Sequence, residues 1–313
     1  KVSNKEDKKI DPIYEKKFLS KFNEYLFKIS DLIEKFQLNV AIAKIYELVN
    51  LLEARPEKNC VDASVAYGVF CEPELTRSGA VEEHNIILTT NKECSFRCVM
   101  CDLWKNTLDD RVEVGDITNQ VRDALNTLPK AKHLKLYNAG TFFDRQSIPK
   151  QDTFEIADMI QDYETLIVEA HPKLIGTSCF EYAQYLRPQL EVAMGLETVD
   201  PSVLPRLEKN MTLDDFECAT TQMLEHDIFV RAFILLRTPW QTEEEGVYWA
   251  KASIDFAQSI GVECCTVIPT RGGNGFLEQV DFEPPTTASL EEVVRYGQSK
   301  HNGRVFGDTW DAS

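Results

Sequence analysis

The stretch Asn91–Lys105, NKECSFRCVMCDLWK, decides how the rest of this sequence is interpreted. It places Cys94, Cys98 and Cys101 in a C-x3-C-x2-C run, directly after the apolar segment Asn85–Thr90, which has the composition of a β-strand. Thiolates are soft ligands, and clustered thiolates select zinc, copper(I) or iron with sulfide. Three cysteines at this spacing therefore predict a shared metal centre.

The number of ligands distinguishes between these metals. A tetrahedral zinc site needs a fourth Cys or His close by, whereas the next histidine is His133 and the next cysteine is Cys179. A [4Fe-4S] cluster is held by thiolates on individual irons, so three cysteines leave one iron open to a ligand from outside the protein. The pattern favours the iron-sulfur cluster, with a zinc knuckle or a set of buried structural thiols as the alternatives.

At this point the sequence resembles the radical S-adenosylmethionine (SAM) superfamily, in which the same cysteine spacing follows the first barrel strand. The resemblance implies two cofactors: a [4Fe-4S] cluster on Cys94, Cys98 and Cys101, and SAM bound to the open iron through its amino and carboxylate groups. It also implies a reductant, such as a flavodoxin- or ferredoxin-like protein. The family usually has an aromatic residue before the third cysteine; Met100 stands there in this sequence and is expected to shield the cluster.

From Asn85 onward, segments with the composition of strands alternate with segments that have a helical period. We expect strands at Asn85–Thr90, His133–Asn138, Thr165–Ala170, Leu190–Leu196, Ile228–Leu236 and Val262–Pro269. We expect helices at Ile117–Leu128, Thr153–Tyr163, Phe180–Leu186, Leu213–His226 and Glu243–Ile260. Repeats of an apolar strand and a helix predict an α/β fold with an all-parallel sheet covered by helices. The resemblance implies a partial (β/α)6 barrel; a doubly wound open sheet is the alternative on pattern alone.

The core is expected to have an extension on each side. Residues 1–80 comprise a helical hairpin of structural role, from about Ile10 to Arg55, and a loop punctuated by proline and glycine from Arg55 to Ala80. Residues 81–280 form the radical SAM core. Residues 281–313 form a C-terminal extension with a helix at Leu290–Gln298 and a last apolar piece, Arg304–Trp310, that is either an extra strand or a lid.

Charge and composition restrict the classes of substrate. The 313 residues include 34 basic and 51 acidic side chains, a formal net charge of -17, which disfavours binding to the phosphate backbone of nucleic acids. The sequence has no apolar run of about 18 residues, so we expect no membrane span. It begins at Lys1 without an initiator Met and without the apolar core of a signal peptide. With nine cysteines, these features predict a reducing, cytoplasmic location.

Residues at the carboxyl ends of the strands are the candidates for binding SAM, because functional side chains of parallel α/β barrels gather there. Tyr137, Asn138 and Gly140 follow the second strand, where the resembled family carries a small-residue motif whose backbone binds the SAM amino group; an ordinary turn is the alternative. Glu169 ends the third strand, as in the branch with coproporphyrinogen dehydrogenase-like, elongator-type and archaeosine-type enzymes. A salt bridge is its alternative role, and the role of His171 stays open.

The fourth strand resembles the same branch through Gly195 and Glu197. Strand alternation places Glu197 on the same face as Glu191, and a carboxylate on an apolar strand needs a partner. We therefore expect Glu197 to contact SAM. Arg231 in the fifth strand is expected either to bind the SAM carboxylate, as a matching basic residue does in relatives, or to pair with Glu191 or Glu197.

Two residues are candidates for a direct role in the reaction. Cys265 in the sixth strand is a candidate catalytic hydrogen donor or substrate-linked thiol, and a buried apolar thiol is the simpler account of it. Arg271 lies in the glycine-rich turn after that strand, Thr270–Gly275, and is a candidate for binding a substrate anion. No second cysteine-rich segment follows, so no auxiliary cluster is expected.

Together these residues imply a radical SAM enzyme that reductively cleaves SAM to a 5'-deoxyadenosyl radical and abstracts hydrogen from a small-molecule or carrier-bound substrate. A tRNA-modifying enzyme is the second hypothesis, because the resembled branch contains such enzymes. Cleavage of a different carbon-sulfur bond of SAM, with transfer of a 3-amino-3-carboxypropyl group, is the third. An iron-sulfur electron carrier is the alternative from another class and predicts a bound cluster without turnover of SAM.

Overall fold

The computed structural model describes residues 26–30, 58–59, 61–272, 274–280, 282–300 and 304–309. The chain divides into two units, Lys1–Pro56 and Glu57–Ser313. In the first unit residues 26–30 are helical, and the rest of the predicted helical hairpin lies outside the described residues. The second unit contains the cysteine motif and all candidate site residues.

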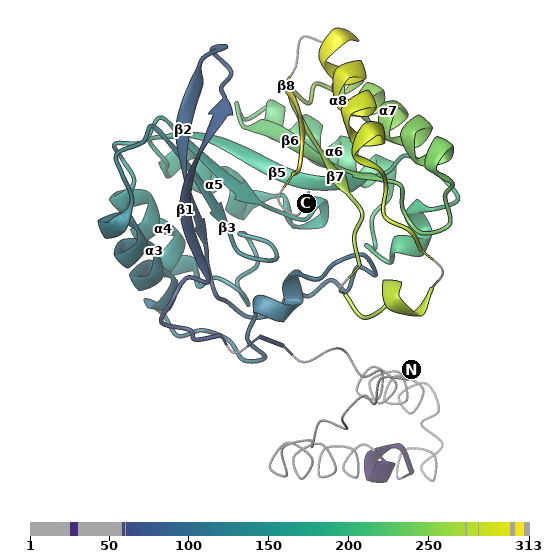
Figure 1. Ribbon diagram of the computed structural model, residues 1–313. Coiled ribbons are helices and arrows are strands. Elements are labelled where there is room, and N and C mark those ends of the chain that lie inside the picture. The colour runs from purple at the N-terminus through teal and green to yellow at the C-terminus, as the bar shows by residue number, and fades with distance from the viewer. Residues whose placement is uncertain are drawn as a thin grey trace, which may run out of the picture. The chain divides into compact units, whose positions relative to one another are not determined.

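The second unit is built on one eight-stranded sheet whose strands follow their order in the sequence. Strands β2 to β8 run parallel to one another, and β1 runs antiparallel to β2 at one edge. The strands curve into a partial barrel, as Figure 1 shows. Their bounds are β1 Gly68–Leu75, β2 Val81–Leu88, β3 His133–Tyr137, β4 Thr165–Glu169, β5 Gln189–Glu197, β6 Phe229–Leu236, β7 Cys264–Pro269 and β8 Arg304–Gly307.

Helices follow most of the parallel strands and lie on the outer side of the curved sheet (Figure 1). Two of them begin with a capping box, in which Thr212 or Thr242 exchanges hydrogen bonds with the residue three positions later. The α-helices are α3 Asp116–Thr127, α4 Lys150–Met159, α5 Thr177–Tyr185, α6 Leu213–Leu224, α7 Glu243–Ser259 and α8 Thr287–Lys300. The short 3-10 helices are η1 Leu103–Asn106, η2 Pro172–Leu174, η3 Leu204–Leu207 and η4 Leu277–Gln279.

Strand β1 corrects two predictions. The sequence predicts a loop for Arg55–Ala80 and an all-parallel sheet, whereas Gly68–Leu75 pairs with β2 along its whole length and makes the sheet mixed. Pro73 indicates a loop because proline cannot donate a ladder hydrogen bond, yet an edge strand has one unpaired side and accommodates it. The six predicted parallel strands are all present, Arg304–Gly307 adds β8 beside β7, and the predicted partial barrel is confirmed.

Strand alternation gives the sheet two chemically different faces. In β6, Val230 and Ala232 belong to the apolar core beneath the helices, so Arg231 and Phe233 face the space inside the barrel. The same alternation holds along the other parallel strands, whose core residues include Leu134, Leu136, Leu166, Val168, Leu190, Val192, Met194, Leu196, Cys265 and Val267. The interior of the barrel therefore receives the polar residues of these strands.

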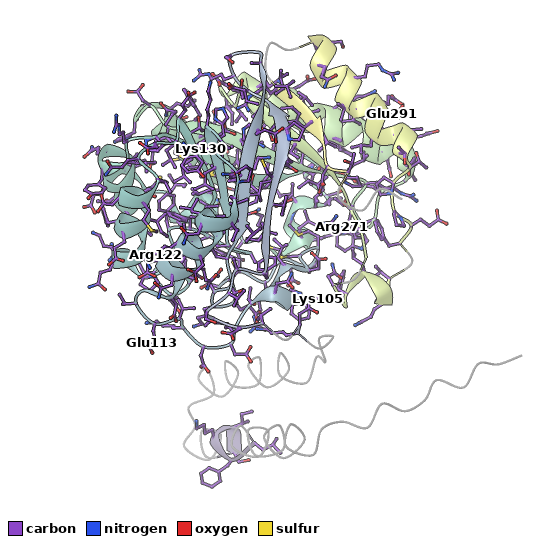
Figure 2. The ribbon with its side chains drawn as sticks, turned by 60° about the vertical axis from the view of Figure 1, so that its left-hand side comes forward. Lys105, Glu113, Arg122, Lys130, Arg271 and Glu291 are labelled. Atoms are coloured by element: carbon purple, nitrogen blue, oxygen red, sulfur yellow. The ribbon has the colours of Figure 1, made fainter. Side chains whose placement is uncertain are left out.

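The surface of this unit carries charged side chains of both signs. Glu113, Arg122, Lys130 and Glu291 are exposed and point away from the sheet (Figure 2). Among the described residues, no helix combines the length and the apolar character that crossing a membrane requires.

Candidate functional site

The cysteine motif forms the loop after β2, at the carboxyl end of the parallel strands. All three thiols are unpaired and half-buried: Cys94, Cys98 and Cys101. Two contacts hold the segment between the last two cysteines. The Val99 N–H donates to the Leu207 carbonyl at 3.1 Å, and the Asn274 side-chain amide donates to the Val99 carbonyl at 2.8 Å. The loop is therefore fixed by two other loops of the same barrel end.

The surroundings of the thiols disfavour free negative charge. Met100 packs against a small apolar cluster formed by Val203, Leu207 and Leu235. Burial raises the pKa of Cys98 to about 11 and that of Cys101 to about 12, and the thiols also act on one another, which places the three sulfur atoms within electrostatic reach. The thiols are therefore uncharged unless a cation binds to the sulfur atoms.

The loop after β3 approaches the cysteine loop closely. A Cβ atom placed on Gly140 would lie 3.3 Å from the Cβ of Cys94, so the glycine keeps open a space that a side chain would fill. Next to it, the side chain of Asn138 is fully buried, and both its oxygen and its nitrogen lack a hydrogen-bond partner among the described residues. A buried amide without partners indicates a ligand that completes its hydrogen bonds.

Glu169, the last residue of β4, has a similarly incomplete environment. Its Oε2 atom is buried, and no described residue forms a hydrogen bond with it. Burial raises the pKa of this carboxyl to about 7, against the opposing effects of a hydrogen bond from the Asn138 backbone and of the Lys209 ammonium group. A cationic group of a ligand would stabilise the ionised form of Glu169.

Glu197 forms a buried ion pair with Lys209. Glu197 ends β5, where the pairing with β6 shifts by one residue, and Lys209 follows η3. The pair lies over Gly195, because a Cβ atom at that position would overlap both the carboxylate and the ammonium group. The charge of Lys209 partly opposes the rise that burial causes in the pKa of Cys98. One group of each sign thus lies beside the cysteine motif.

The carboxyl end of the barrel therefore combines two kinds of binding group. Three soft thiols suit iron or another soft metal. The side-chain amide of Asn138 and the Oε2 atom of Glu169, which lack partners among the described residues, suit a small ligand that carries both an amino and a carboxylate group, as does the Glu197–Lys209 pair. The residues present fit a metal cluster with SAM beside it.

Cys265 does not have the predicted catalytic placement. It pairs with Ala232 across β7 and β6, and both residues belong to the apolar core beneath the helices. The neighbouring Cys264 pairs with Arg231 and therefore occupies the inner face instead. Cys265 is a buried apolar thiol, as the simpler account has it.

Arg231 lies in a network of buried ion pairs. Its guanidinium donates to Glu191 Oε1 at 2.7 Å and to the two carboxylate oxygens of Glu74 at 3.0 and 2.7 Å. Arg231 lies near the start of β6, Phe229–Leu236, whereas the cysteine loop lies beyond the ends of the strands. This contact is the pair with Glu191 that the sequence offers as one of two roles for Arg231, and a contact with SAM stays a prediction.

Tyr137 and Arg271 lie at the carboxyl ends of their strands, where the sequence places them. Tyr137 ends β3 on the inner face, with its ring edge-on to Phe233 at 6.4 Å between centroids. Arg271 follows β7 (Figure 2), in the loop whose Asn274 holds the backbone of Val99. Their roles in binding SAM and substrate stay predictions.

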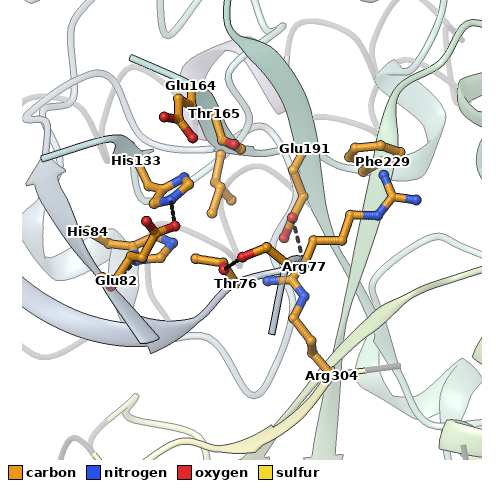
Figure 3. A pocket seen from close by; sticks show the side chains of 12 residues that line it. Thr76, Arg77, Glu82, His84, His133, Glu164, Thr165, Glu191, Phe229 and Arg304 are labelled. Atoms are coloured by element: carbon orange, nitrogen blue, oxygen red, sulfur yellow. Dashed lines mark hydrogen bonds and ion pairs between the residues drawn. The ribbon is translucent and has the colours of Figure 1, made fainter. Parts of the chain in front are cut away.

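The amino ends of the strands form a separate polar region. A pocket of about 200 Å³ lies there, and Figure 3 shows the side chains that line it. Glu82, His133 and Glu164 each place one possible ligand atom within 4.8 Å of the others. The Lys132 ammonium lies 2.7 Å from Glu82 and 3.5 Å from Glu164. The chain itself thus supplies the cation that balances these carboxylates.

Sequence reasoning missed Lys209 and left His171 without a role. Lys209 stands in a loop between two residues with left-handed backbone, Glu208 with φ 51° and Asn210 with φ 55°. A charged residue in a polar loop is normally solvated, so nothing in the sequence marks this one as buried. The sequence does mark His171 as a candidate site residue, because it follows Glu169, the glutamate at a strand end, by two residues.

No model of a known protein family matches the sequence, and no curated protein matches it. Solved structures do match. Methylornithine synthase (PylB) superposes with a TM-score of 0.54 and 14% identity, over 70% of this chain and 63% of the other. SuiB from Streptococcus suis, solved with bound SAM, gives a TM-score of 0.50 and 14% identity over 71% and 46%. Coproporphyrinogen III oxidase (HemN) from Escherichia coli gives 0.48 and 12% identity over 69% and 51%.

HemN is a radical SAM enzyme, and the second unit of this chain has the fold of methylornithine synthase and SuiB. The resemblance that the cysteine motif indicates is confirmed at the level of the fold, which is what 14% identity carries. The chain covers from 46% to 63% of the length of the three solved structures named above.

Proposed function

We propose that this chain is a radical SAM enzyme, with a [4Fe-4S] cluster held by Cys94, Cys98 and Cys101 and SAM bound beside it. The proposal is carried by the coincidence of the cysteine motif and partnerless polar groups at one end of a radical SAM fold. When bound, the reduced cluster supplies the electron that cleaves SAM to methionine and a 5'-deoxyadenosyl radical, which abstracts hydrogen from the substrate.

In this proposal the chain's own polar groups orient SAM. Glu169 accepts a hydrogen bond from the SAM ammonium group, and the pKa of Glu169, raised to about 7 by burial, falls when that cation binds. Asn138 completes its hydrogen bonds on the same ligand. Glu197 offers a negative group and Lys209 a positive group. The amino and carboxylate groups of SAM can therefore take the place of each partner in this ion pair, and no buried charge is left without a counter-charge.

The remaining contacts exclude water. Met100 and its apolar neighbours cover one side of the cysteine loop, and a dry site protects a reactive radical from side reactions. A flavodoxin- or ferredoxin-like protein is the proposed electron donor.

We propose a small-molecule or carrier-bound substrate. A net charge of -17 supports this class over RNA, whose backbone such a chain repels. A tRNA substrate and transfer of a 3-amino-3-carboxypropyl group are the competing reactions, and an iron-sulfur electron carrier is the competing non-enzyme. The products formed from SAM separate these alternatives.

The test is anaerobic reconstitution with iron and sulfide, followed by SAM, dithionite and chromatography. We expect 5'-deoxyadenosine from the wild-type chain. Methylthioadenosine in its place would identify cleavage of the other bond. A bound cluster that yields neither product, with cell extract added as a source of substrate, would favour the electron carrier.

The cysteine ligands have a matched control within the chain. Replacing Cys94, Cys98 or Cys101 by Ala should abolish cluster binding and SAM cleavage. Cys218→Ala removes an exposed free thiol outside the motif and should leave the iron content unchanged. Full iron content in any of the three motif variants would overturn the assignment.

A further inference from the structure

His171 is buried at 6% exposure, two residues after Glu169. Its Nε2 atom lies 2.9 Å from the carbonyl oxygen of Lys209, and its Nδ1 atom accepts a hydrogen bond from the N–H of Lys173 at 3.2 Å. A carbonyl only accepts and a backbone N–H only donates, so the single ring proton must reside on Nε2. The two bonds therefore fix both the orientation and the neutral tautomer of the ring.

The face of the same ring contacts the cysteine loop. It stacks on Phe96 with 3.6 Å between ring centroids and 7° between the planes. Phe96 stands between Cys94 and Cys98 in the motif. This parallel stacking of the two rings restrains the rotation of the loop segment that carries Cys94 and Cys98.

The backbone of His171 contacts a third loop. Its N–H donates to Thr141 Oγ1 at 2.5 Å, and Thr141 follows Gly140, the residue that approaches Cys94. One residue thus touches the cysteine loop, the loop after β3 and the loop that carries Lys209. Burial lowers the pKa of His171 to about 4, so the ring keeps its neutral form near neutral pH.

We infer that His171 is a positioning residue, which holds the Lys209 ammonium group in register with the cysteine loop for SAM binding. The inference rests on the proposed function. Lys209 is fixed at one end by its carbonyl on His171 and at the other by its ion pair with Glu197. Loss of the first contact frees the Lys209 backbone, and the ammonium group then no longer has one defined position beside the thiols.

Two substitutions separate the contacts of the ring. His171→Phe keeps a flat ring for Phe96 and loses both ring hydrogen bonds, while His171→Gln keeps an amide donor and loses the stack. We expect both variants to bind iron like the wild type. For the cleavage of SAM to 5'-deoxyadenosine, we expect the KM for SAM to rise about 10- to 100-fold in His171→Phe, with a smaller change in kcat. A change of this size is typical when a residue that orients metal-site groups is replaced. The change that SAM causes in the EPR spectrum of the reduced cluster should weaken in both variants.

His226 provides the matched control. Its ring also stacks on a phenylalanine, Phe180, with 3.9 Å between centroids, and its Nδ1 atom lies 2.8 Å from the Gln222 carbonyl. It is exposed after the end of α6, away from the three loops. His226→Phe should keep the wild-type KM and the wild-type EPR response.

A wild-type KM for SAM and an unchanged EPR response in both His171 variants would overturn the inference alone. If His171→Phe does not fold, Phe96→Leu provides a second test, because it removes the ring stack by changing the half-buried partner instead of His171. An unchanged EPR response in Phe96→Leu counts equally against the inference. A wild-type chain that binds a cluster yet shows no SAM response overturns the proposed function, and the inference with it.

Discussion

Glu197 and Lys209 form an ion pair inside the protein, with exposed fractions of 6% and 8%. Glu197 also has a left-handed backbone with φ 64°. Such a conformation costs about 1 to 3 kcal/mol in a residue other than glycine, and removing two charges from water adds a further penalty. Strained and charged buried groups of this kind concentrate at functional sites. These costs support our proposal that the pair serves a ligand at the carboxyl end of the barrel.

Replacing Lys209 by Met tests this explanation. The substitution keeps most of the side-chain volume and removes the cation, so a ligand carboxylate loses a charged hydrogen bond worth about 1.5 to 3 kcal/mol. We expect the affinity for SAM to fall roughly 10- to 100-fold while the iron content stays at the wild-type level. Equilibrium dialysis of SAM against the anaerobic, cluster-loaded chain measures the change.

The control for this substitution is Lys173→Met. Lys173 is an exposed lysine whose ammonium group lies 3.7 Å from Asp215, so its loss should leave SAM binding unchanged. Equal affinities of the wild type and Lys209→Met for SAM would remove Lys209 from the site.

At the residue scale, the sequence predicts side chains on strands better than side chains in loops. Glu197 could be placed on the inner face because strand alternation predicts the faces of β5, and its carboxylate does lie over Gly195 although the ladder shifts by one residue there. Lys209 depends on a loop path that no local pattern encodes. The burial of Cys265 in the core, with Cys264 on the inner face, has a simple cause. One residue of register decides which of two adjacent cysteines faces inward, and that register is set by pairing with Arg231 and Ala232 on β6.

At the scale of elements, the amino end of the barrel is closed by charges that join its two edge strands. Glu74 on β1 contacts Arg231 on β6 at 2.7 Å, Lys135 on β3 at 2.7 Å and Arg304 on β8 at 3.4 Å. Arg304 also contacts Glu191 on β5 at 2.8 Å. Strands β1 and β8 are the two ends of the sheet order and share no ladder. The network holds the open barrel together where hydrogen bonds between strands are missing.

Removing the charge of Glu74 should destabilise the fold. Glu74→Gln leaves Lys135 and the two arginines with fewer anions in a buried setting, and breaking a buried pair typically costs about 3 to 5 kcal/mol. We expect a loss at the lower end of that range, because Glu191 still serves both arginines. Urea unfolding at pH 7, with equal iron loading in both chains, measures the difference.

Glu72 provides the comparison for Glu74. It contacts the same Lys135 at 2.7 Å, but its side chain is 42% exposed, against 10% for Glu74. Exposed pairs contribute about 1 kcal/mol or less, so Glu72→Gln should have a small effect. Equal losses in the two variants would contradict a buried network that closes the barrel.

The elements themselves follow from the sequence because parallel strands buried on both sides leave apolar runs that stand out between amphipathic helices. Strand β1 escapes this rule. It lies at the edge, its burial alternates only between exposed and half-buried positions, and Pro73 adds the signature of a loop. Its partners in the network, Arg231 and Arg304, lie 157 and 230 residues away along the chain. No local pattern reports contacts at such separations.

At the scale of the whole molecule, buried ionisable groups set how stability depends on pH. Burial lowers the pKa of His84 from its ordinary value of 6.5 to about 4, and that of His171 to about 4. Salt bridges to Arg231 and its neighbours, acting against burial, lower the pKa of Glu74 and Glu191. Each of these groups binds protons more weakly in the folded chain than in the unfolded chain. Their contribution is therefore complete above the unfolded pKa and is lost as pH falls.

The direction of this pH dependence, and the pH range over which stability is lost, can be tested at His84, a histidine outside the cysteine motif. The unfolded chain takes up a proton at His84 below about pH 6.5 and the folded chain only near pH 4, so folding stability should fall across this window by up to about 1.4 kcal/mol per pH unit for this group. His84→Asn places an amide near the Glu82 carbonyl that His84 Nδ1 contacts at 3.0 Å, and it cannot titrate. Urea unfolding at pH 7, 6 and 5 measures how the free energy of unfolding depends on pH, and this dependence should be shallower for the variant.

Acid affects the cluster in both chains, so the relevant quantity is the difference between their two slopes of unfolding free energy against pH. The exposed His226→Asn serves as control. Parallel slopes for the wild type and His84→Asn would mean that His84 titrates alike in the folded and unfolded chains.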